Sequence, residues 1–376
     1  MQGLSLESAT RWTRVGVLAA FALVLGYLET FIPIPVPGVK LGLANIAILL
    51  CFMRLDAGAA FFVTLIKVLA QGLLFGSPLT FAYSLTGSIA AFAVMALTSR
   101  IPGMPPVMVS IGGALAHIAG QMVVAAVLLG TRFVWLAAPV LMVAALVTGS
   151  LCGVLAERLD RALDERAEND AEPEEGVPVI EIAELPEVSD RPVGAVLAGF
   201  AVFTVLVIIQ NDLLLLSVLF GLAMLACVLT RVKLSVLLRG LRAFLVLFVV
   251  SAVAHLVTYS GGAAAGAIAR MGLRLGAIMG MSLAVMSMFE RDDLLAFTVR
   301  TAHRLARLGI DTQGPLLALN VCLQTVPVLA SGMEPGSGHI SLHGTLDAIA
   351  DVYARADGLA QAICSEMGEG DGNALA

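Results

Sequence analysis

About ten apolar runs of roughly 20 residues each, separated by short loops, constrain this chain more than any other feature. Such a run, coiled into a helix, crosses a hydrocarbon core of about 30 Å and satisfies its own backbone hydrogen bonds. The runs lack the period-two alternation of membrane barrel strands. We therefore expect an all-α, polytopic membrane protein. Only 13% of the residues are charged and 59% are hydrophobic, which excludes a soluble enzyme.

An acidic segment divides the chain. From Glu157 to Arg191 it holds 13 acidic and 4 basic residues, against 28 and 22 in the whole sequence. This composition, with several prolines, cannot bury enough apolar surface to order fully. The formal net charge of -6 thus reflects one linker, and no nucleic-acid partner is indicated. We interpret residues 1–157 as one membrane module, 158–192 as a cytoplasmic linker, 193–332 as a second membrane module and 333–376 as a solvated cytoplasmic tail.

The first module is predicted to have six spans, near residues 14–32, 41–54, 57–75, 79–99, 106–129 and 133–156. A cytoplasmic N-terminus places seven arginines on inner loops and ends and only Lys40 and Arg132 outside, in agreement with the positive-inside rule. The second module is predicted to span near residues 193–209, 212–230, 241–259 and 264–289. A last apolar run, Leu316–Leu329, is only about 14 residues long and marginal for spanning.

Polar residues inside the spans are the first candidates for function, because charge in lipid is costly. Lys67 and Gln71 lie four residues apart in one span, as do His117 and Gln121 in another, so each pair shares a helix face. The two faces could line a polar cavity. Alternatively, the pairs only join helices by hydrogen bonds, or Lys67 extends its ammonium toward the interface.

A proline-rich loop, FIPIPVPGVKLGLANI, follows the first span and forces an extended, stiff segment at the outer mouth. Lys40 would begin the second helix, with Asn45 one turn deeper, where helix amides also favour an anion. The other interpretation is a rigid connector with a solvated lysine. Lys40, Lys67 and His117 together suggest an acidic or phosphorylated small molecule, although Glu29 could pair with a lysine.

Small residues recur every four positions in the first span, a spacing that lets helices approach closely in lipid. They are Gly16 and Ala20, then Ala22 and Gly26. They could form a docking face, although such spacing arises easily by chance in an alanine-rich chain.

The stretch from Glu290 to Ile310 is a predicted amphipathic helix with an apolar stripe and a second face that carries Arg300, Arg304 and Arg307. On the cytoplasmic side, such a basic helix either lies on anionic lipid or fits a groove of a soluble partner.

Several motifs are absent from the sequence. There is no GxxxxGK[ST] phosphate loop and no DDxxD motif, so neither ATP hydrolysis nor magnesium-assisted prenyl transfer is expected of this chain. The five cysteines are scattered without metal-ligand spacing. We expect no enzyme activity, no cofactor and no metal.

The run GYLETFIPIPVPGVKLGLANI resembles the signature of the Gx transporter family, also called heptaprenyl diphosphate synthase component I. That family is similar to the six-helix substrate-binding S components of energy-coupling factor (ECF) transporters. The resemblance covers about residues 14 to 160. It implies a bacterial plasma-membrane protein that binds its substrate from outside.

The second module is similar to the T component of the same transporters, from Ala269 to Leu329. An arginine-bearing span, an acidic helix start, an Arg-rich amphipathic helix and an apolar helix follow one another in the family's order. T components couple to two ATPase subunits through arginines of two Ala-Arg-Gly signatures. Here the nearest candidate centres on Arg355, lacks the glycine, and has no second copy after it.

The leading hypothesis is a fused ECF importer subunit that binds a small anion through Lys40, Asn45, Lys67, Gln71, His117 and Gln121. Arg300, Arg304, Arg307 and Arg355 would contact the ATPases. An alternative is a non-catalytic membrane subunit of heptaprenyl diphosphate or quinone synthesis that binds a polyprenyl diphosphate. A third is an interaction scaffold within a membrane redox complex.

Overall fold

The structure is a computed structural model, and it describes residues 5–29, 42–74, 78–129, 135, 138–169, 191–238, 245, 248–249, 252–253, 255–256, 262–307, 312–331 and 353. All regular elements in these ranges are helical, which confirms the all-α prediction for this part of the chain. The helices are α1 (Leu6–Leu28), α2 (Asn45–Arg54), α3 (Ala57–Leu74), α4 (Pro78–Thr98), α5 (Pro106–Leu129), α6 (Ala138–Asn169), α7 (Val193–Ile209), α8 (Leu213–Leu229), α10 (Gly262–Met288), α11 (Arg291–Arg307) and α12 (Gln313–Ser331).

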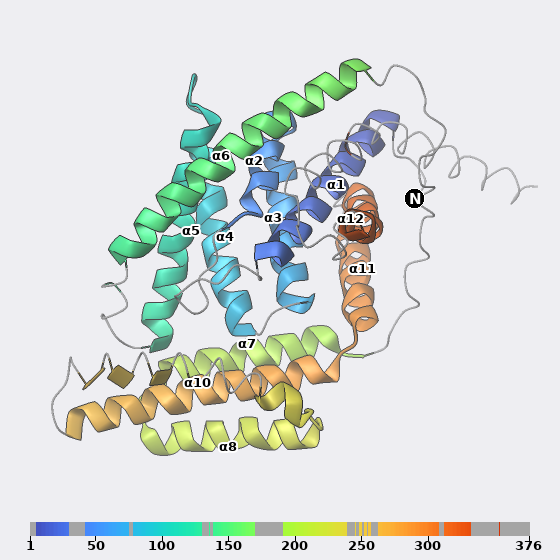
Figure 1. The fold of residues 1–376 in the computed structure, drawn as a ribbon. Helices are drawn as coiled ribbons and strands as arrows, with labels where there is room; N and C mark the ends of the chain where they lie inside the picture. The colour runs from blue at the N-terminus through green and yellow to red at the C-terminus, as the bar shows by residue number, and fades with distance from the viewer. Residues whose placement is uncertain are drawn as a thin grey trace, which may run out of the picture.

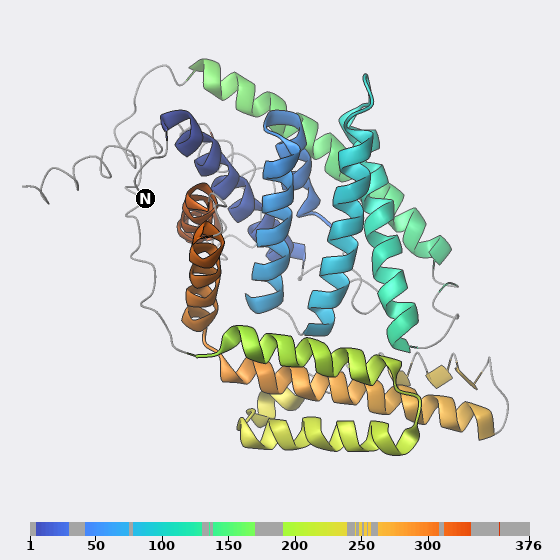
Figure 2. The ribbon, with the colours of Figure 1, turned by 180° about the vertical axis from the view of Figure 1, so that it is seen from behind.

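The helices form two layers. Helices α1 to α6 pack against one another, with α1 and α6 slanted against the upright α3, α4 and α5, and α7, α8 and α10 form a second layer that runs crosswise beneath these upright helices (Figure 1). Helix α11 turns away from the end of α10, and α12 continues beside α1 (Figure 2). The second half of the chain therefore contacts the first along α1, at α3, where α11 packs, and at the ends of α4 and α5, where Tyr83 and Val124 pack on the second layer.

Four described helices are long and apolar enough to cross a membrane, which indicates a membrane protein. They lie in α1, α5, α6 and α10. The sequence suggested about ten spans, but α2 has only 10 residues and is about 15 Å long, too short to cross. Because α10 runs crosswise to α5 (Figure 1), these four helices cannot all lie along the normal of one flat membrane.

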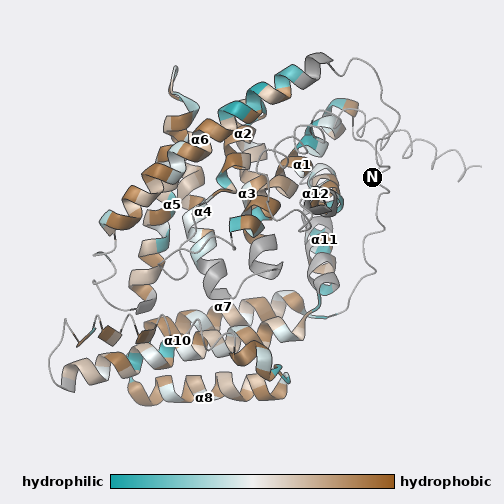
Figure 3. Ribbon diagram, viewed as in Figure 1, coloured by the Kyte–Doolittle hydropathy of each residue, from teal (hydrophilic) through white to brown (hydrophobic). Residues whose placement is uncertain are grey.

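The two layers expose apolar surface to different extents. Most of α1 is buried, and its side chains form the centre of the largest core cluster. Helices α7 and α8 are apolar on all sides and largely exposed, for example at Val205, Leu214 and Val228 (Figure 3). Such all-round apolarity is typical of helices that face lipid.

Helix α6 is longer than predicted and continues to Asn169, so residues 158–169 of the expected linker are helical. Arg54, at the end of α2, donates to Asp160 Oδ1 at 2.5 Å and to Asp164 Oδ1 at 2.7 Å. Leu159 and Leu163 are each only 2% exposed. The buried Leu159 and Leu163 and the ion pairs of the partly buried Arg54 therefore hold this extension against the first layer.

Helix α2 is shorter than predicted and begins at Asn45, not near residue 41. Gly42 has φ of +87°, a left-handed conformation that glycine adopts without strain and that cannot continue into a helix. Asn45 is therefore the first residue of α2, and it does not lie one turn inside it as the sequence suggested.

The tail was expected to be solvated, but Tyr353 is 5% exposed and belongs to the core cluster of α1. The Arg14 guanidinium lies 5.7 Å from the centre of the Tyr353 ring. At this residue the tail contacts the first layer, because the aromatic ring covers apolar surface and attracts a cation.

Candidate ligand-binding site

A chain of polar contacts joins the end of α1, the turn before α2, and the middle of α3. Glu29 follows α1 and its Oε1 accepts a hydrogen bond from the Gly42 backbone N–H at 2.5 Å. Lys67 Nζ, on α3, donates to Asn45 Oδ1, on α2, at 2.8 Å. A Cβ added to Gly42 would lie 2.9 Å from Asn45 Nδ2, so the amide folds back over the glycine. These residues therefore form one polar cluster, which we call the Lys67 cluster (Glu29, Gly42, Asn45 and Lys67).

The Lys67 cluster is shielded from its surroundings. Glu29 is 5% exposed, Asn45 6% and Lys67 3%. Cys152, on α6, lies within electrostatic range of both Glu29 and Lys67. A buried amine and carboxylate in lipid-embedded protein are costly unless they are paired or hydrogen-bonded. Glu29 joins the end of α1 to the turn before α2, while Lys67 on α3 is bonded to Asn45 on α2.

A second polar pair lies on α5. Gln121 Nε2 and His117 Nε2 are 3.0 Å apart, and each residue is 3% exposed. A Cβ added to Gly87 on α4 would lie 2.9 Å from the His117 ring, so glycine is what allows the ring to approach α4. The buried Gln121 Oε1 accepts no hydrogen bond from the described residues.

The structure joins four of the six predicted site residues in two pairs. It joins Asn45 to Lys67 between helices, and His117 to Gln121 within one helix. Gln71 belongs to α3, but its side chain is outside the description, and Lys40 lies outside the described residues. The four described side chains are all buried within the first layer and do not face lipid.

The predicted docking face on α1 lies inside the molecule. A Cβ added to Gly16 would lie 2.7 Å from Ala318 O and 2.7 Å from Val321 Cβ, both on α12. Ala20 and Ala22 are fully buried and Gly26 is also buried. Close approach at Gly16 thus brings α12, from the second half of the chain, onto α1.

Of the predicted partner-binding arginines, Arg304 and Arg307 are exposed in the last turn of α11, and Arg300 is partly buried. Arg300 Nη2 lies 3.4 Å from the Arg191 carbonyl. Arg355 lies outside the described residues.

Arg191 was not singled out from the sequence, yet it fixes the bend between α10 and α11. Its Nη1 donates to Asp293 Oδ2 at 2.8 Å and to the Met288 carbonyl at 3.0 Å. Asp293 also accepts from the Glu290 N–H at 2.9 Å. No local signal in the sequence pairs Arg191 with Asp293, because the two residues are 102 positions apart.

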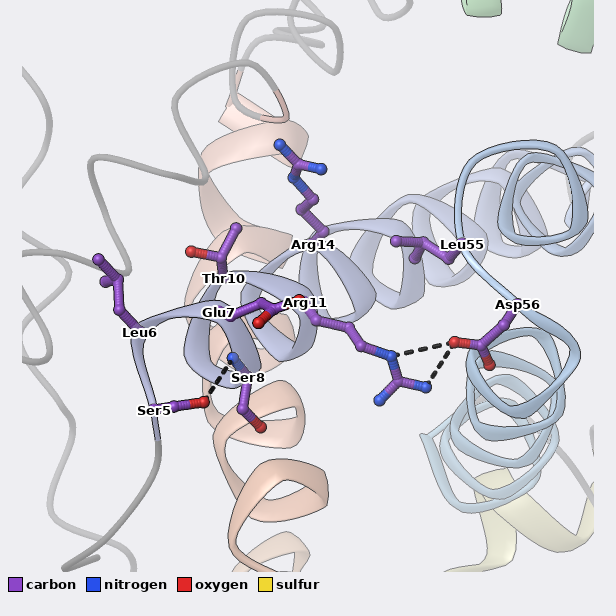
Figure 4. A pocket seen from close by; sticks show the side chains of 9 residues that line it. All are labelled: Ser5, Leu6, Glu7, Ser8, Thr10, Arg11, Arg14, Leu55 and Asp56. Carbon is purple, nitrogen blue, oxygen red and sulfur yellow. Dashed lines mark hydrogen bonds and ion pairs between the residues drawn. The ribbon is translucent and has the colours of Figure 1, made fainter.

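An open pocket of about 760 Å³ lies at the other end of α1 (Figure 4). There Arg11 Nη2 lies 2.7 Å from Asp56 Oδ2. Burial raises the pKa of Asp56, but hydrogen bonds from the Ala59 N–H and from Arg11 outweigh it, so the pKa is held below its ordinary value. The pocket carries charges of both signs and joins α1 to the α2–α3 turn.

In the described part of the chain, no three His, Cys, Asp or Glu residues gather in a way that would hold a metal ion. Cys51, Cys152, Cys227 and Cys322 are free and buried. The Lys67 cluster offers hydrogen-bond donors and charge, which is the chemistry of noncovalent recognition.

Comparison with known families agrees with the resemblance in the first half. Residues 18–159 match the family described as heptaprenyl diphosphate synthase component I. The match extends from α1 into α6, includes both polar pairs, and covers less than half of the 376 residues. Comparison with curated proteins and with solved structures gives no match.

Proposed function

We propose that this chain is the membrane subunit of an ECF-type importer, in which the first layer binds a small anionic substrate and the second half couples it to separate ATPase subunits. The observation that carries the proposal is a buried lysine cluster within a layer whose first helix packs closely on α12. One polypeptide would then hold both the receptor and the element that moves it.

The chemistry of the Lys67 cluster favours an anion. Asn45 accepts a hydrogen bond from the Lys67 amine, and Glu29 accepts one from the Gly42 N–H. The ammonium is a charged hydrogen-bond donor, and a carboxylate or phosphate is its natural acceptor in a low-dielectric site. The buried Gln121 Oε1 is an acceptor, so it would contact a hydrogen-bond donor of the substrate and not its anionic oxygens.

Coupling would pass through the α1–α12 contact. ATP-driven motion of α11, with Arg304 and Arg307 exposed, would shift α12 and tilt the first layer with it. The tether between α6 and α7 keeps the two halves at high effective concentration. The substrate would arrive from the outer side and two ATPase subunits would bind on the cytoplasmic side.

The description of the matching family supports a second candidate function. The match favours this second candidate at least as well as it favours the importer. In this alternative, the protein is a non-catalytic membrane component of heptaprenyl diphosphate or quinone synthesis. Lys67 would meet the diphosphate, and the apolar surroundings would accept the polyprenyl chain.

Replacement of Lys67 by Met tests the binding site. Uptake of the substrate, once identified by mass spectrometry of compounds that co-purify with the protein, should be abolished, because the buried amine is lost while the apolar volume is kept. The matched control is Lys233→Met, which removes an exposed lysine from the turn after α8 and should leave uptake unchanged. Normal uptake by Lys67→Met in membranes that hold the variant would refute the proposed site.

The two candidates differ in their partners. Purification of the full chain in mild detergent should recover ATPase subunits if it is an importer, and a soluble prenyl diphosphate synthase if it is a synthase component. Recovery of redox enzymes alone would instead favour a scaffold. The double variant Arg304→Glu and Arg307→Glu should no longer recover the ATPases, because the two substitutions reverse the charge of the exposed surface that would bind them.

A further inference from the structure

Two arginines lie on successive turns of α10, a helix that is otherwise apolar enough to cross a membrane. Arg270 and Arg274 are four residues apart and thus share one face. Both are partly buried. Like charges at this spacing repel each other, and apolar surroundings strengthen the repulsion. Neither the binding site nor the coupling helices require this pair.

Both guanidinium groups lie toward the start of α10. Arg270 folds back along the helix, because its Nη1 lies 3.5 Å from the position that a Gly266 Cβ would take. Arg274 Nη2 donates to the Gln210 carbonyl at 2.6 Å and to Asn211 Oδ1 at 2.8 Å, both in the turn between α7 and α8. The pair is therefore level with the polar turn of the second layer, where its apolar helices end.

Neither arginine forms an ion pair with any described residue, in contrast to Arg191 at the opposite end of α10. The buried Arg274 Nε has no hydrogen-bond acceptor in the described part of the chain. The turn supplies only a carbonyl and an amide, and the carboxylate nearest in sequence, Asp212, caps α8 by accepting from the Leu215 N–H at 3.0 Å. Two cations beside lipid without a counter-charge are costly, and a bound anion would remove that cost.

We propose that Arg270 and Arg274 bind the phosphate of an anionic phospholipid at the level of the α7–α8 turn. Arginine is suited to phosphate because its planar fork donates two parallel hydrogen bonds. A phospholipid places its phosphate at the depth where an apolar helix meets a polar turn, and its acyl chains cover the exposed faces of α7 and α8. On the topology predicted from the sequence, this is the outer side, where the positive-inside rule leaves few basic residues. The inference does not depend on the transport proposal.

The test uses the full chain in a neutral detergent, with thermal unfolding followed as phosphatidylglycerol, phosphatidylcholine or inorganic phosphate is added. Phosphatidylglycerol should raise the melting temperature of the wild type, and Arg270→Gln should raise the half-saturating concentration at least about tenfold, which corresponds to loss of charge-assisted hydrogen bonds. Arg270→Lys keeps the charge but loses the planar fork of donors. Its half-saturating concentration should lie between those of the wild type and Arg270→Gln.

Arg270→Gln is preferred to Arg274→Gln, because Arg274 holds the turn and its loss could disturb folding, whereas Arg270 contacts no described residue through a hydrogen bond or ion pair. Lys233→Gln removes an exposed charge at the other end of the same layer and should leave the titration unchanged within about twofold. Equal titrations for wild type and Arg270→Gln would overturn the site. An Arg270-dependent response to inorganic phosphate but not to lipid would overturn the lipid as its source.

Discussion

The two layers of this molecule use glycine and polar groups in different ways. In the first layer, glycines lie against backbone: a Cβ at Gly16 would meet Ala318 O, and one at Gly120 would meet Thr86 O, each at 2.7 Å. In the second layer, the glycines of α10 lie against side chains, since a Cβ at Gly276 would meet the Phe220 ring at 2.7 Å, and a Cβ at Gly199 on α7 or Gly221 on α8 would meet nothing within 4 Å. The first layer also buries the Lys67–Asn45 hydrogen bond between two of its helices. In the second layer, Arg274 instead donates to the turn between α7 and α8. This contrast indicates that helix backbones touch directly in the first layer, whereas in the second layer α10 is tightly packed and the outer faces of α7 and α8 are open.

The largest expected effect comes from filling the closest contact between the halves. Gly16→Leu should lower the free energy of unfolding by about 3 kcal/mol, because the new side chain must displace the α12 backbone at Ala318 and Val321. Thermal unfolding of the purified protein in detergent measures it.

Gly199→Leu is the matched change in the second layer and should be close to neutral or slightly stabilising, because leucine has the higher helix propensity and meets no neighbour. If both variants lose similar stability, the two layers do not differ in packing as we describe.

The Asn45–Lys67 contact should show strong coupling in a double-mutant cycle. Asn45→Leu should cost about 2 kcal/mol, because the buried Lys67 amine loses the Asn45 Oδ1 acceptor. Lys67→Met should be far less destabilising, and once it is made, Asn45→Leu should lose most of its effect. Unfolding of the four proteins under one set of detergent conditions gives the coupling energy, and additive effects would mean that Lys67 does not depend on Asn45.

Helical spacing predicted part of this site and could not predict the rest. It placed His117 beside Gln121, as the structure has them, because both lie on one helix. The same reasoning grouped Lys67 with Gln71, yet the described partner of Lys67 is Asn45, on another helix. Sequence period tells which face a residue occupies and not which helix lies opposite.

The fold shows the same division between local and tertiary information. Apolar run length located most helices, and the Leu159 and Leu163 spacing could have revealed that α6 continues into the acidic segment. Nothing in the local sequence indicates that α7, α8 and α10 run crosswise to α3, α4 and α5. That arrangement depends on contacts between distant segments, such as those of α10 with α4 and α5.

At the bend between α10 and α11, Arg191→Gln should cost about 1 kcal/mol, because its partner Asp293 is buried but Arg191 itself is 52% exposed. The effect should be local. Hydrogen exchange should accelerate at Met288 to Asp293, where the arginine bonds are lost, and stay unchanged in α1. Uniform acceleration in both layers would show that the bend is not an independent element of the second layer.

The smallest effect is expected at the exposed end of the first layer, where Asp56 pairs with Arg11. Asp56→Asn should cost less than about 1 kcal/mol at pH 7, because the pair is solvent-screened and asparagine can still cap the Ala59 N–H. The folded pKa of Asp56 is lowered, so its stabilisation is fully present above the unfolded pKa of about 3.9 and is lost as pH falls through the folded pKa. The unfolding midpoints of wild type and Asp56→Asn should therefore converge below about pH 4. Glu7→Gln, in the same pocket but outside any ion pair of the described residues, should give a smaller difference at pH 7. A gap that persists unchanged in acid would show that Asp56 stabilises the α1 end through its shape and not through its charge.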